Sequence, residues 1–287
     1  HHGRSPPCVD SLISCRPGRV VIGAVDPNPL VSGKGIAALR QSGIPTEVGV
    51  LDAACREINR FFFKFIRTGL PYVTLKFAQT LDGRIATVTG DARWVSSPAS
   101  RRFAHRLRST HDAILVGAGT IRTDDPELTC RLVRGRDPLR IVLDSRLRLP
   151  PDAKVFTDGK PTLVVSTGRA TADRRYPLEE KGIEILEIAE DAQGRIDLEQ
   201  LLIDLGKRNI TSLLVEGGAS AAASFLKGNL VDRLLVVLAP KIAGEGIAAI
   251  GPLGIQRMTD AIGFSFQRIT RLGEDILLDA RMRTKNP

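Results

Sequence analysis

Charged side chains recur between residues 75 and 131, where apolar runs alternate with glycine-bearing turns. Lys76 lies in an otherwise apolar run, Arg108 near the end of a predicted helix, and Arg131 just after a turn. A buried cation is costly unless it pairs with an anion, and the arginine fork suits a phosphate. Simpler roles exist, since Lys76 could reach the surface and Arg108 could interact with the helix dipole. The grouping favours a site for an anionic ligand.

A second motif is Glu216-Gly217-Gly218, which follows the apolar run Ser212–Val215 and precedes a helix of small residues. Glycines let a phosphate approach the backbone at a helix N-terminus, where free N–H groups favour anions. The motif is neither a GxGxxG fingerprint nor a P-loop, and a tight turn is the simpler interpretation. The carboxylate of Glu216 favours a ligand, because it could bind sugar hydroxyls.

Three further side chains have both a functional and a structural interpretation. Thr120 and Asp124 follow the predicted strand Ala113–Gly117, and α/β sheets bind ligands beyond the carboxyl ends of their strands. Trp94, the single tryptophan, could stack on a planar ring or pack as a lid. Cys8 precedes a short helix, where a thiol can ligate zinc, although a structural role is the simpler one.

Composition narrows the possible partners. The chain has 287 residues and a net charge of +9, but its arginines are dispersed and aromatic residues make up only 5%. A nucleic-acid site needs a basic patch with stacking aromatics, so no nucleic-acid partner is expected. The charge fits a solvated surface or a small phosphorylated substrate. No apolar run is long enough for a membrane helix, and the four scattered cysteines indicate a reducing cytoplasm.

Two units are predicted, 1–70 and 71–287. In the first, Asp52 is expected to cap a long helix through residue 67. In the second, Ser97 and Asp197 should cap helices, and Asp82 could pair with Arg84 across a turn. Strands should alternate with helices in an α/β fold, giving a mostly parallel sheet flanked by helices, with an antiparallel hairpin at one edge. Strands are predicted over residues 72–78, 113–117, 140–144, 162–166, 183–188, 212–216, 233–239, 264–272 and 276–282.

Seven segments, in order, resemble the bifunctional riboflavin-biosynthesis deaminase/reductase family. They are HHGRSPPCVDSLI, DPNPLVSGKGIAALRQSGIPTEVGV, FIRTGLPYVTLKFAQTLDGRIAT, RWVSSPASRR, DAILVGAGTIRTDDPELTCR, PLRIVLDS and LLVEGG. The resemblance covers essentially the whole chain. It implies a dihydrofolate-reductase-like domain that uses NADPH to reduce the ribosyl group of 5-amino-6-(5-phosphoribosylamino)uracil to ribityl.

The resemblance also assigns site residues. Lys76 and Glu216 would be catalytic, with Lys76 as electrophile or proton donor. Substrate contacts fall on Ala92, Arg108, Leu128, Arg131 and Glu216. Cofactor contacts fall on Ala78, Trp94, Thr120, Asp124, Ser145, Gly218, Ala219 and Ser220. Ala92 departs from the family, which often has serine there. Arg146 and Arg148, close to Ser145, could accommodate a 2′-phosphate.

The first unit resembles the C-terminal part of a cytidine-deaminase-like zinc domain. Cys8 matches its last zinc ligand, whereas the ligand histidine, the glutamate and the first cysteine have no counterpart, and His1 and His2 do not match the histidine. The resemblance therefore implies an N-terminally incomplete deaminase domain that should neither hold zinc nor deaminate, and a complete parent protein that does both. It also implies a homo-oligomer. A catalytically silent nucleotide-binding or regulatory protein on the same scaffold is the alternative.

Overall fold

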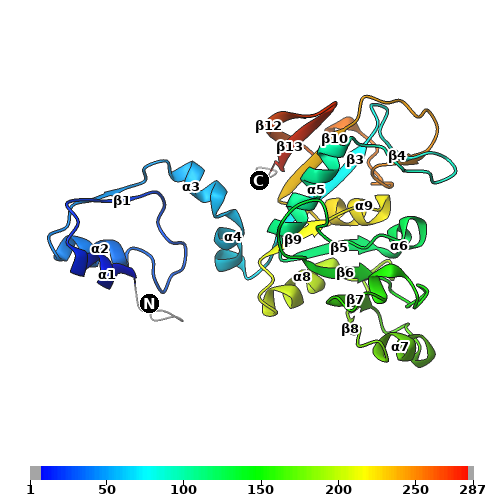
Figure 1. Cartoon of the computed structure of the whole chain (residues 1–287), viewed down its shortest axis with the longest axis horizontal. Helices are drawn as coiled ribbons and strands as arrows, with labels where there is room; N and C mark the ends of the chain where they lie inside the picture. The colour runs from blue at the N-terminus through cyan, green and yellow to red at the C-terminus, as the bar shows by residue number, and fades with distance from the viewer. Residues whose placement is uncertain (1–7, 284–287) are drawn as a thin grey trace. The chain divides into compact units, whose positions relative to one another are not determined.

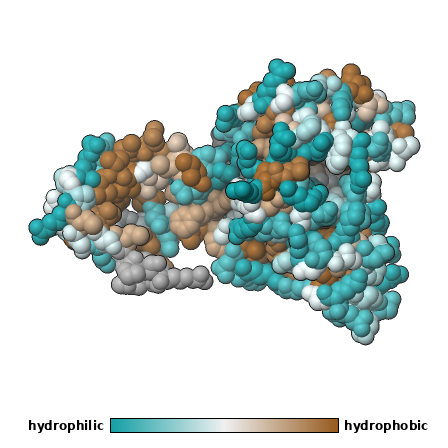
Figure 2. Space-filling view, in the orientation of Figure 1, coloured by the Kyte–Doolittle hydropathy of each residue, from teal (hydrophilic) through white to brown (hydrophobic). Residues whose placement is uncertain are grey.

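The structure, a computed structural model, describes residues 8–283 (Figure 1). The chain forms two compact units, His1–Pro71 and Tyr72–Pro287. His1 and His2 lie outside the described residues. Figure 2 shows hydrophilic residues over much of the visible face of the larger unit.

The smaller unit contains a βαβ arrangement with a small apolar interior. Strand β1 (Val20–Ile22) pairs in parallel with β2 (Thr46–Val48), and α2 (Lys34–Gln41) connects them. Its buried hydrophobic side chains, within the part that the structure describes, are Leu39 and Ile44, as expected of so short a segment. Its other helices are α1 (Cys8–Cys15), α3 (Asp52–Ile58) and α4 (Arg60–Thr68).

The single helix predicted from Asp52 to residue 67 is wrong. Asn59 interrupts it with φ −97° and ψ 18°, and its side-chain amide donates to the carbonyl of Cys55 at 2.9 Å. Asparagine side chains compete in this way with the helical ladder. Asp52 is not the cap, because Leu51 occupies that position in the left-handed conformation and Asp52 instead accepts from Arg56 at 2.6 Å.

The larger unit is built on a nine-stranded sheet in the order β12-β13-β10-β3-β9-β5-β6-β7-β8. Strand β13 runs antiparallel to β10 and β12, and the remaining neighbours are parallel. The prediction of a mostly parallel sheet with an antiparallel hairpin at one edge is confirmed. The strands are β3 (Tyr72–Gln79), β5 (Ala113–Gly117), β6 (Leu139–Leu143), β7 (Thr162–Ser166), β8 (Glu184–Glu187), β9 (Ser212–Val215), β10 (Arg233–Leu238), β12 (Phe264–Leu272) and β13 (Asp275–Met282).

Burial explains why the central strands are continuous apolar runs. Every residue of β7 and β9 is buried, as is every residue of β5 except Gly117. Strands covered on both faces need no polar alternation. Helices flank the sheet (Figure 1): α5 (Pro98–Thr110), α6 (Ala118–Asp124), α7 (Ala172–Glu179), α8 (Leu198–Lys207) and α9 (Ala219–Lys227), with short 3₁₀ helices η1 (Lys154–Phe156) and η2 (Met258–Asp260).

Two predicted helix caps are confirmed. The hydroxyl of Ser97 accepts from the backbone N–H of Ser100, and Asp197 accepts from the N–H groups of Glu199 and Gln200. These bonds satisfy helix donors that lack an intrahelical partner. The caps fix where α5 and α8 begin, and therefore which of their side chains face the sheet.

The turn at Asp82 and Arg84 differs from its prediction. Asp82 accepts from the backbone N–H groups of Ala243 and Gly244 at 3.1 and 2.7 Å. Arg84 donates to the carbonyl of Gly244 at 2.9 Å. Both side chains thus attach the turn to a distant segment, where β4 (Arg84–Ala86) pairs antiparallel with β11 (Ile247–Ala248), rather than pairing with each other.

Candidate functional site

A cleft of about 610 Å³ lies at the carboxyl ends of four strands of the large sheet. Because β3, β9, β5 and β6 are parallel neighbours, their carboxyl ends meet at one edge. Most of the predicted site residues line this cleft: Lys76, Ala78, Ala92, Thr120, Asp124, Ser145, Glu216, Gly218, Ala219 and Ser220. Residues more than a hundred positions apart in the chain therefore share one cavity.

Strand register places Lys76 beside Glu216. Leu75 of β3 pairs with Val215 of β9, so Lys76, within β3, lies beside Glu216, the residue that directly follows β9. Burial lowers the pKa of Lys76, although the negative charge of Glu216 opposes that effect. Lys76 is therefore a better proton donor than an exposed lysine.

Glu216 is held by a two-point ion pair. Arg108 donates from Nε to Oε1 at 2.9 Å and from Nη2 to Oε2 at 2.7 Å. The side chains are only 12% and 9% exposed. Burial disfavours the charge on Glu216, but Arg108 and Lys76 outweigh it and lower the pKa of Glu216 to about 2. Glu216 is therefore a carboxylate at neutral pH.

Arg108 also connects the cleft to the turn that carries two predicted substrate contacts. Its Nη1 donates to the carbonyl of Thr129 at 3.0 Å. Leu128 is buried in this turn with φ +56°. Arg131 is 50% exposed and pairs with Glu127 at 2.7 Å. Arg108, Leu128 and Arg131 do not line the cleft itself, so their contact with a substrate stays a prediction.

His105 is a residue that the sequence did not single out. It is 7% exposed on α5, three residues before Arg108. Burial and the nearby charges of Arg108 and Arg131 lower the pKa of His105 to about 4, so the ring is neutral at physiological pH. Its Nδ1 lies 3.4 Å from the backbone nitrogen of Leu132. The sequence shows His105 three residues before Arg108, a spacing that places the two side chains on the same face of a helix.

Trp94 lies beside the site and not among the residues that line the cleft. The residue is 61% exposed, and the guanidinium carbon of Arg101 lies 4.3 Å from the centroid of its ring. Lys241 donates to its carbonyl at 2.6 Å. These contacts leave much of the ring accessible, which is compatible with the predicted stacking on a cofactor.

The Gly217-Gly218 turn fits a phosphate-bearing cofactor. Both residues have positive φ, 90° and 77°, which favours glycine. A Cβ on Gly218 would lie 3.2 Å from the Thr120 hydroxyl, so a larger residue would crowd the cleft. The turn opens the nine-residue helix α9, whose first N–H groups are suited to an anion.

Cys8 was predicted to ligate zinc only in a complete deaminase domain, and the described residues do not test that prediction. Cys8 is exposed at the start of α1. Among residues 8–283, no group of three or more His, Cys, Asp or Glu side chains is arranged to hold a metal ion. The same residues include no helix long and apolar enough to cross a membrane.

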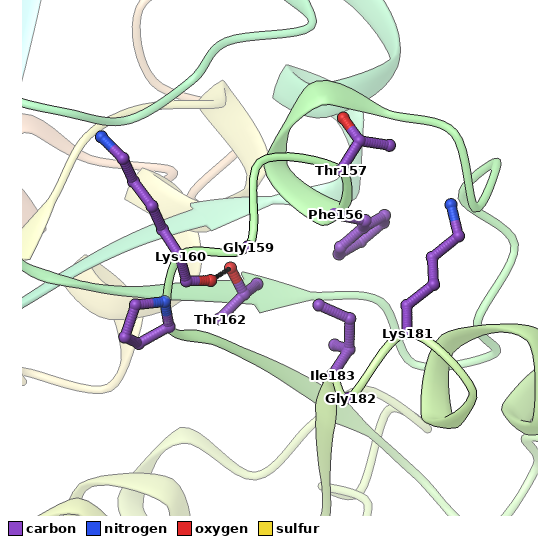
Figure 3. Close-up of a pocket in the computed structure, with 9 residues that line it drawn as sticks. Phe156, Thr157, Gly159, Lys160, Thr162, Lys181, Gly182 and Ile183 are labelled. Atoms are coloured by element: carbon purple, nitrogen blue, oxygen red, sulfur yellow. Dashed lines mark hydrogen bonds between the residues drawn. The ribbon is translucent and has the colours of Figure 1, made fainter.

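A second hollow lies at the opposite edge of the sheet, where β7 and β8 begin (Figure 3). Its volume is about 450 Å³, and Phe156, Thr162 and Ile183 contribute to its wall. Figure 3 shows Lys160 and Lys181 directed apart. Lys160 pairs with Asp137 at 2.6 Å and Lys181 donates to the carbonyl of Pro151 at 2.7 Å. With both ammonium groups engaged elsewhere, this hollow has no converging cations for a phosphate.

The fold and the cleft define an α/β enzyme with its site at the strand ends, and comparison with known proteins identifies the family. Residues 71–278 match the RibD C-terminal domain, so the chain belongs to that family. The riboflavin biosynthesis protein RibD of Aquifex aeolicus is 43% identical over 97% of this chain and 76% of its own length. The Escherichia coli protein of that name is 37% identical over 97% and 78%.

Solved structures agree with the family assignment. Acinetobacter baumannii RibD superimposes with a TM-score of 0.86 at 32% identity, covering 99% of this chain and 78% of its own. The riboflavin biosynthesis reductase Rib7 of Saccharomyces cerevisiae aligns with a TM-score of 0.59 at 26% identity, covering 75% and 91%. The chain thus contains the reductase domain of riboflavin biosynthesis, and the predicted resemblance is confirmed.

Proposed function

We propose that the 72–287 unit uses NADPH to reduce the ribosyl group of 5-amino-6-(5-phosphoribosylamino)uracil to a ribityl group. A protein from Thermotoga maritima that is 33% identical, with a TM-score of 0.84, is described as a reductase of that compound and as a deaminase. The observation that carries the proposal is the juxtaposition of Lys76 and Glu216 in the cleft that also contains the Gly217-Gly218 turn.

The reaction adds a hydride and a proton across the C1′ double bond of the ring-opened sugar. NADPH, when bound, supplies the hydride. Lys76 donates the proton to the heteroatom bonded to C1′, since its burial disfavours the ammonium form. Solvent then reprotonates Lys76. Aligning donor and acceptor is the protein's main contribution.

Glu216 and Arg108 hold the sugar. The carboxylate of Glu216 is fixed at both oxygens by Arg108, and its remaining lone pairs can accept from ribose hydroxyls. Arg131 binds the 5′-phosphate. Its exposed ion pair with Glu127 is replaced by one with the doubly charged phosphate. The backbone at Ala92 supplies the contact for which the family often uses a serine.

The cofactor occupies the remainder of the cleft in this proposal. The backbone N–H groups of Gly218, Ala219 and Ser220 at the start of α9 would hold its pyrophosphate. Thr120 and Asp124 of α6 face the same space. Burial raises the pKa of Asp124, and Arg93, whose Nη2 donates to the Asp124 carbonyl at 3.1 Å, opposes that shift.

The direct test is NADPH oxidation by the purified chain in the presence of the phosphoribosylamino-uracil. We expect oxidation that depends on this substrate, with a product heavier by two hydrogens in mass spectrometry. A folded chain that binds NADPH but does not oxidise it with this substrate would instead support the silent nucleotide-binding alternative.

A further inference from the structure

Arg195 is a cation in the cleft to which the proposed reduction gives no role. It lies in the segment between β8 and α8, directly before the buried Ile196, and it lines the cleft together with Ile196 and Leu198. The sequence had instead suggested Arg146 and Arg148 for a 2′-phosphate. Both are exposed and neither lines the cleft, whereas their neighbour Ser145 does.

The guanidinium of Arg195 is oriented by its own loop. Nε donates to one oxygen of Asp191 at 3.0 Å. Nη2 lies 2.9 Å from the same oxygen and donates to the side-chain oxygen of Gln193 at 3.1 Å. The other Asp191 oxygen accepts from the backbone N–H of Arg195 at 2.9 Å. Nη1 is directed elsewhere and lies 3.5 Å from the hydroxyl of Ser224 on α9, another cleft residue. Asp191 and Gln193 therefore engage Nε and Nη2, and Nη1, whose contact with Ser224 is long, is left to bind an anion beside that hydroxyl.

The dimensions of the cleft indicate which anion Arg195 could bind. Lys76 is on β3, and Leu143 and Ser145 mark the end of β6, three strands away in the order β3-β9-β5-β6. At about 4.8 Å per strand, these ends are roughly 14 Å apart. A dinucleotide whose nicotinamide lies near Lys76 can thus extend its adenosine towards Leu143. The apolar side chains of Leu143, Ile196 and Leu198 suit an adenine ring.

We infer that Arg195 is the residue with which this chain distinguishes NADPH from NADH, by binding the 2′-phosphate of the adenosine through Nη1 beside Ser224. Asp191 acts as a positioning residue, because it touches Arg195 and not the ligand. The inference rests on the proposed function, since it assumes that a nicotinamide dinucleotide occupies the cleft.

The test measures binding without catalysis. Calorimetry compares adenosine 2′,5′-bisphosphate with 5′-AMP, which lacks the 2′-phosphate, on the wild-type chain and on Arg195→Gln. We expect the wild type to prefer the bisphosphate and the variant to lose about 10- to 100-fold in affinity for it, with its 5′-AMP affinity unchanged. In steady-state kinetics, the same variant should raise KM for NADPH and leave KM for NADH unchanged.

Arg122→Gln and Arg148→Gln are matched controls. Arg122 is another arginine that lines the cleft, and Arg148 is one that the sequence suggested. Both should retain the preference for the bisphosphate. Three results would overturn the inference. They are a control that loses the preference, an Arg195→Gln variant whose affinities for the two nucleotides fall equally, and a wild type without a preference. Absence of turnover in a wild type that still prefers the bisphosphate would overturn the proposed reduction and leave the role of Arg195 intact.

Discussion

Arg108 and Glu216 form the central ion pair of the site, with Nη2 and Oε2 2.7 Å apart although 108 positions separate the residues in the chain. The pair joins the end of helix α5 to the end of strand β9. Because the remaining guanidinium nitrogen, Nη1, donates to Thr129, the pair also holds the turn that carries Arg131. One buried arginine thus links the carboxylate that we propose binds the sugar to the predicted phosphate site.

Glu216→Gln should damage both activity and stability. It leaves the Arg108 guanidinium buried without its counter-charge, which costs about 3 kcal/mol or more, and it removes a group that orients the sugar, so kcat/KM should fall about 100-fold. Urea unfolding and initial rates measure the two effects. The matched control is Glu184→Gln, because Glu184 pairs with Arg208 at the surface. That change should cost less than about 1 kcal/mol, and equal losses in both variants would contradict a special role for the buried pair.

Arg131→Ala should weaken the substrate far more than NADPH. Loss of a charged hydrogen-bond donor to the 5′-phosphate should raise the substrate KM about 10- to 100-fold, whereas the cofactor is bound by other residues. Steady-state kinetics with each ligand varied in turn gives both constants. Arg134→Ala, at another exposed arginine of the same loop, is the control and should change neither. Similar increases in both constants for Arg131→Ala would argue against the phosphate role.

Lys76→Met should depress turnover while preserving the fold. Methionine keeps an unbranched side chain of similar size and removes the ammonium group, so the proton for the heteroatom bonded to C1′ must come from water. We expect a lower kcat with little change in the affinity for NADPH, measured by calorimetry. Lys227→Met, at the exposed end of α9, should leave kcat unchanged. A wild-type rate in Lys76→Met would remove that lysine from the mechanism.

Gly218→Ala should impair cofactor binding more than its effect on stability explains. Alanine at φ +77° costs about 1–2 kcal/mol of backbone strain, and its Cβ would meet the Thr120 hydroxyl at 3.2 Å. Gly159→Ala provides the control, since Gly159 has φ +69° with open space around it and lines the second hollow. Both variants should lose thermal stability, Gly218→Ala more because of the added contact with Thr120, but only Gly218→Ala should lose NADPH affinity. Equal affinity of the two variants for NADPH would contradict the proposed contact between Gly218 and the pyrophosphate.

His105 should make the larger unit less stable as the pH falls. The folded-state pKa is about 4, below the ordinary value of 6.5, so the unfolded chain takes up this proton first. Stability from the neutral ring is complete above about pH 6.5 and is lost as the pH falls towards 4. Unfolding monitored through Trp94, the single tryptophan, should show a shallower pH dependence in this window for His105→Gln. Identical profiles would show that the ring does not titrate in this way.

The sequence predicted the layout of the larger unit well, because that layout depends on local signals. Continuous apolar runs indicate strands covered on both faces, and the caps at Ser97 and Asp197 fix where helices begin. Helices α6 and α7 were not predicted. The first begins within Gly117-Ala118-Gly119, which resembles a turn, and the second contains Pro177, which usually ends a helix.

The site was predictable in its membership and not in its contacts. The glycines at 217 and 218, Lys76 within an apolar strand and Glu216 at the end of another are visible in the sequence. The pairing of Arg108 with Glu216 is not, because it depends on how α5 lies over the sheet. The sequence suggested Arg148 near the cofactor because it is close to Ser145 in the chain. The arginine that lines the cleft is Arg195, and its position depends on how the segment before α8 folds.

Transfer of deuterium tests the central claim most directly. The chain is mixed with the phosphoribosylamino-uracil and NADPH that carries deuterium at C4 of the nicotinamide, on each face in turn, and the product is analysed by mass spectrometry and NMR. We predict one deuterium at C1′ of a ribityl product from one of the two labelled cofactors. A ribityl product with no deuterium from either cofactor, or no product from a chain that binds NADPH, would contradict direct reduction in this cleft.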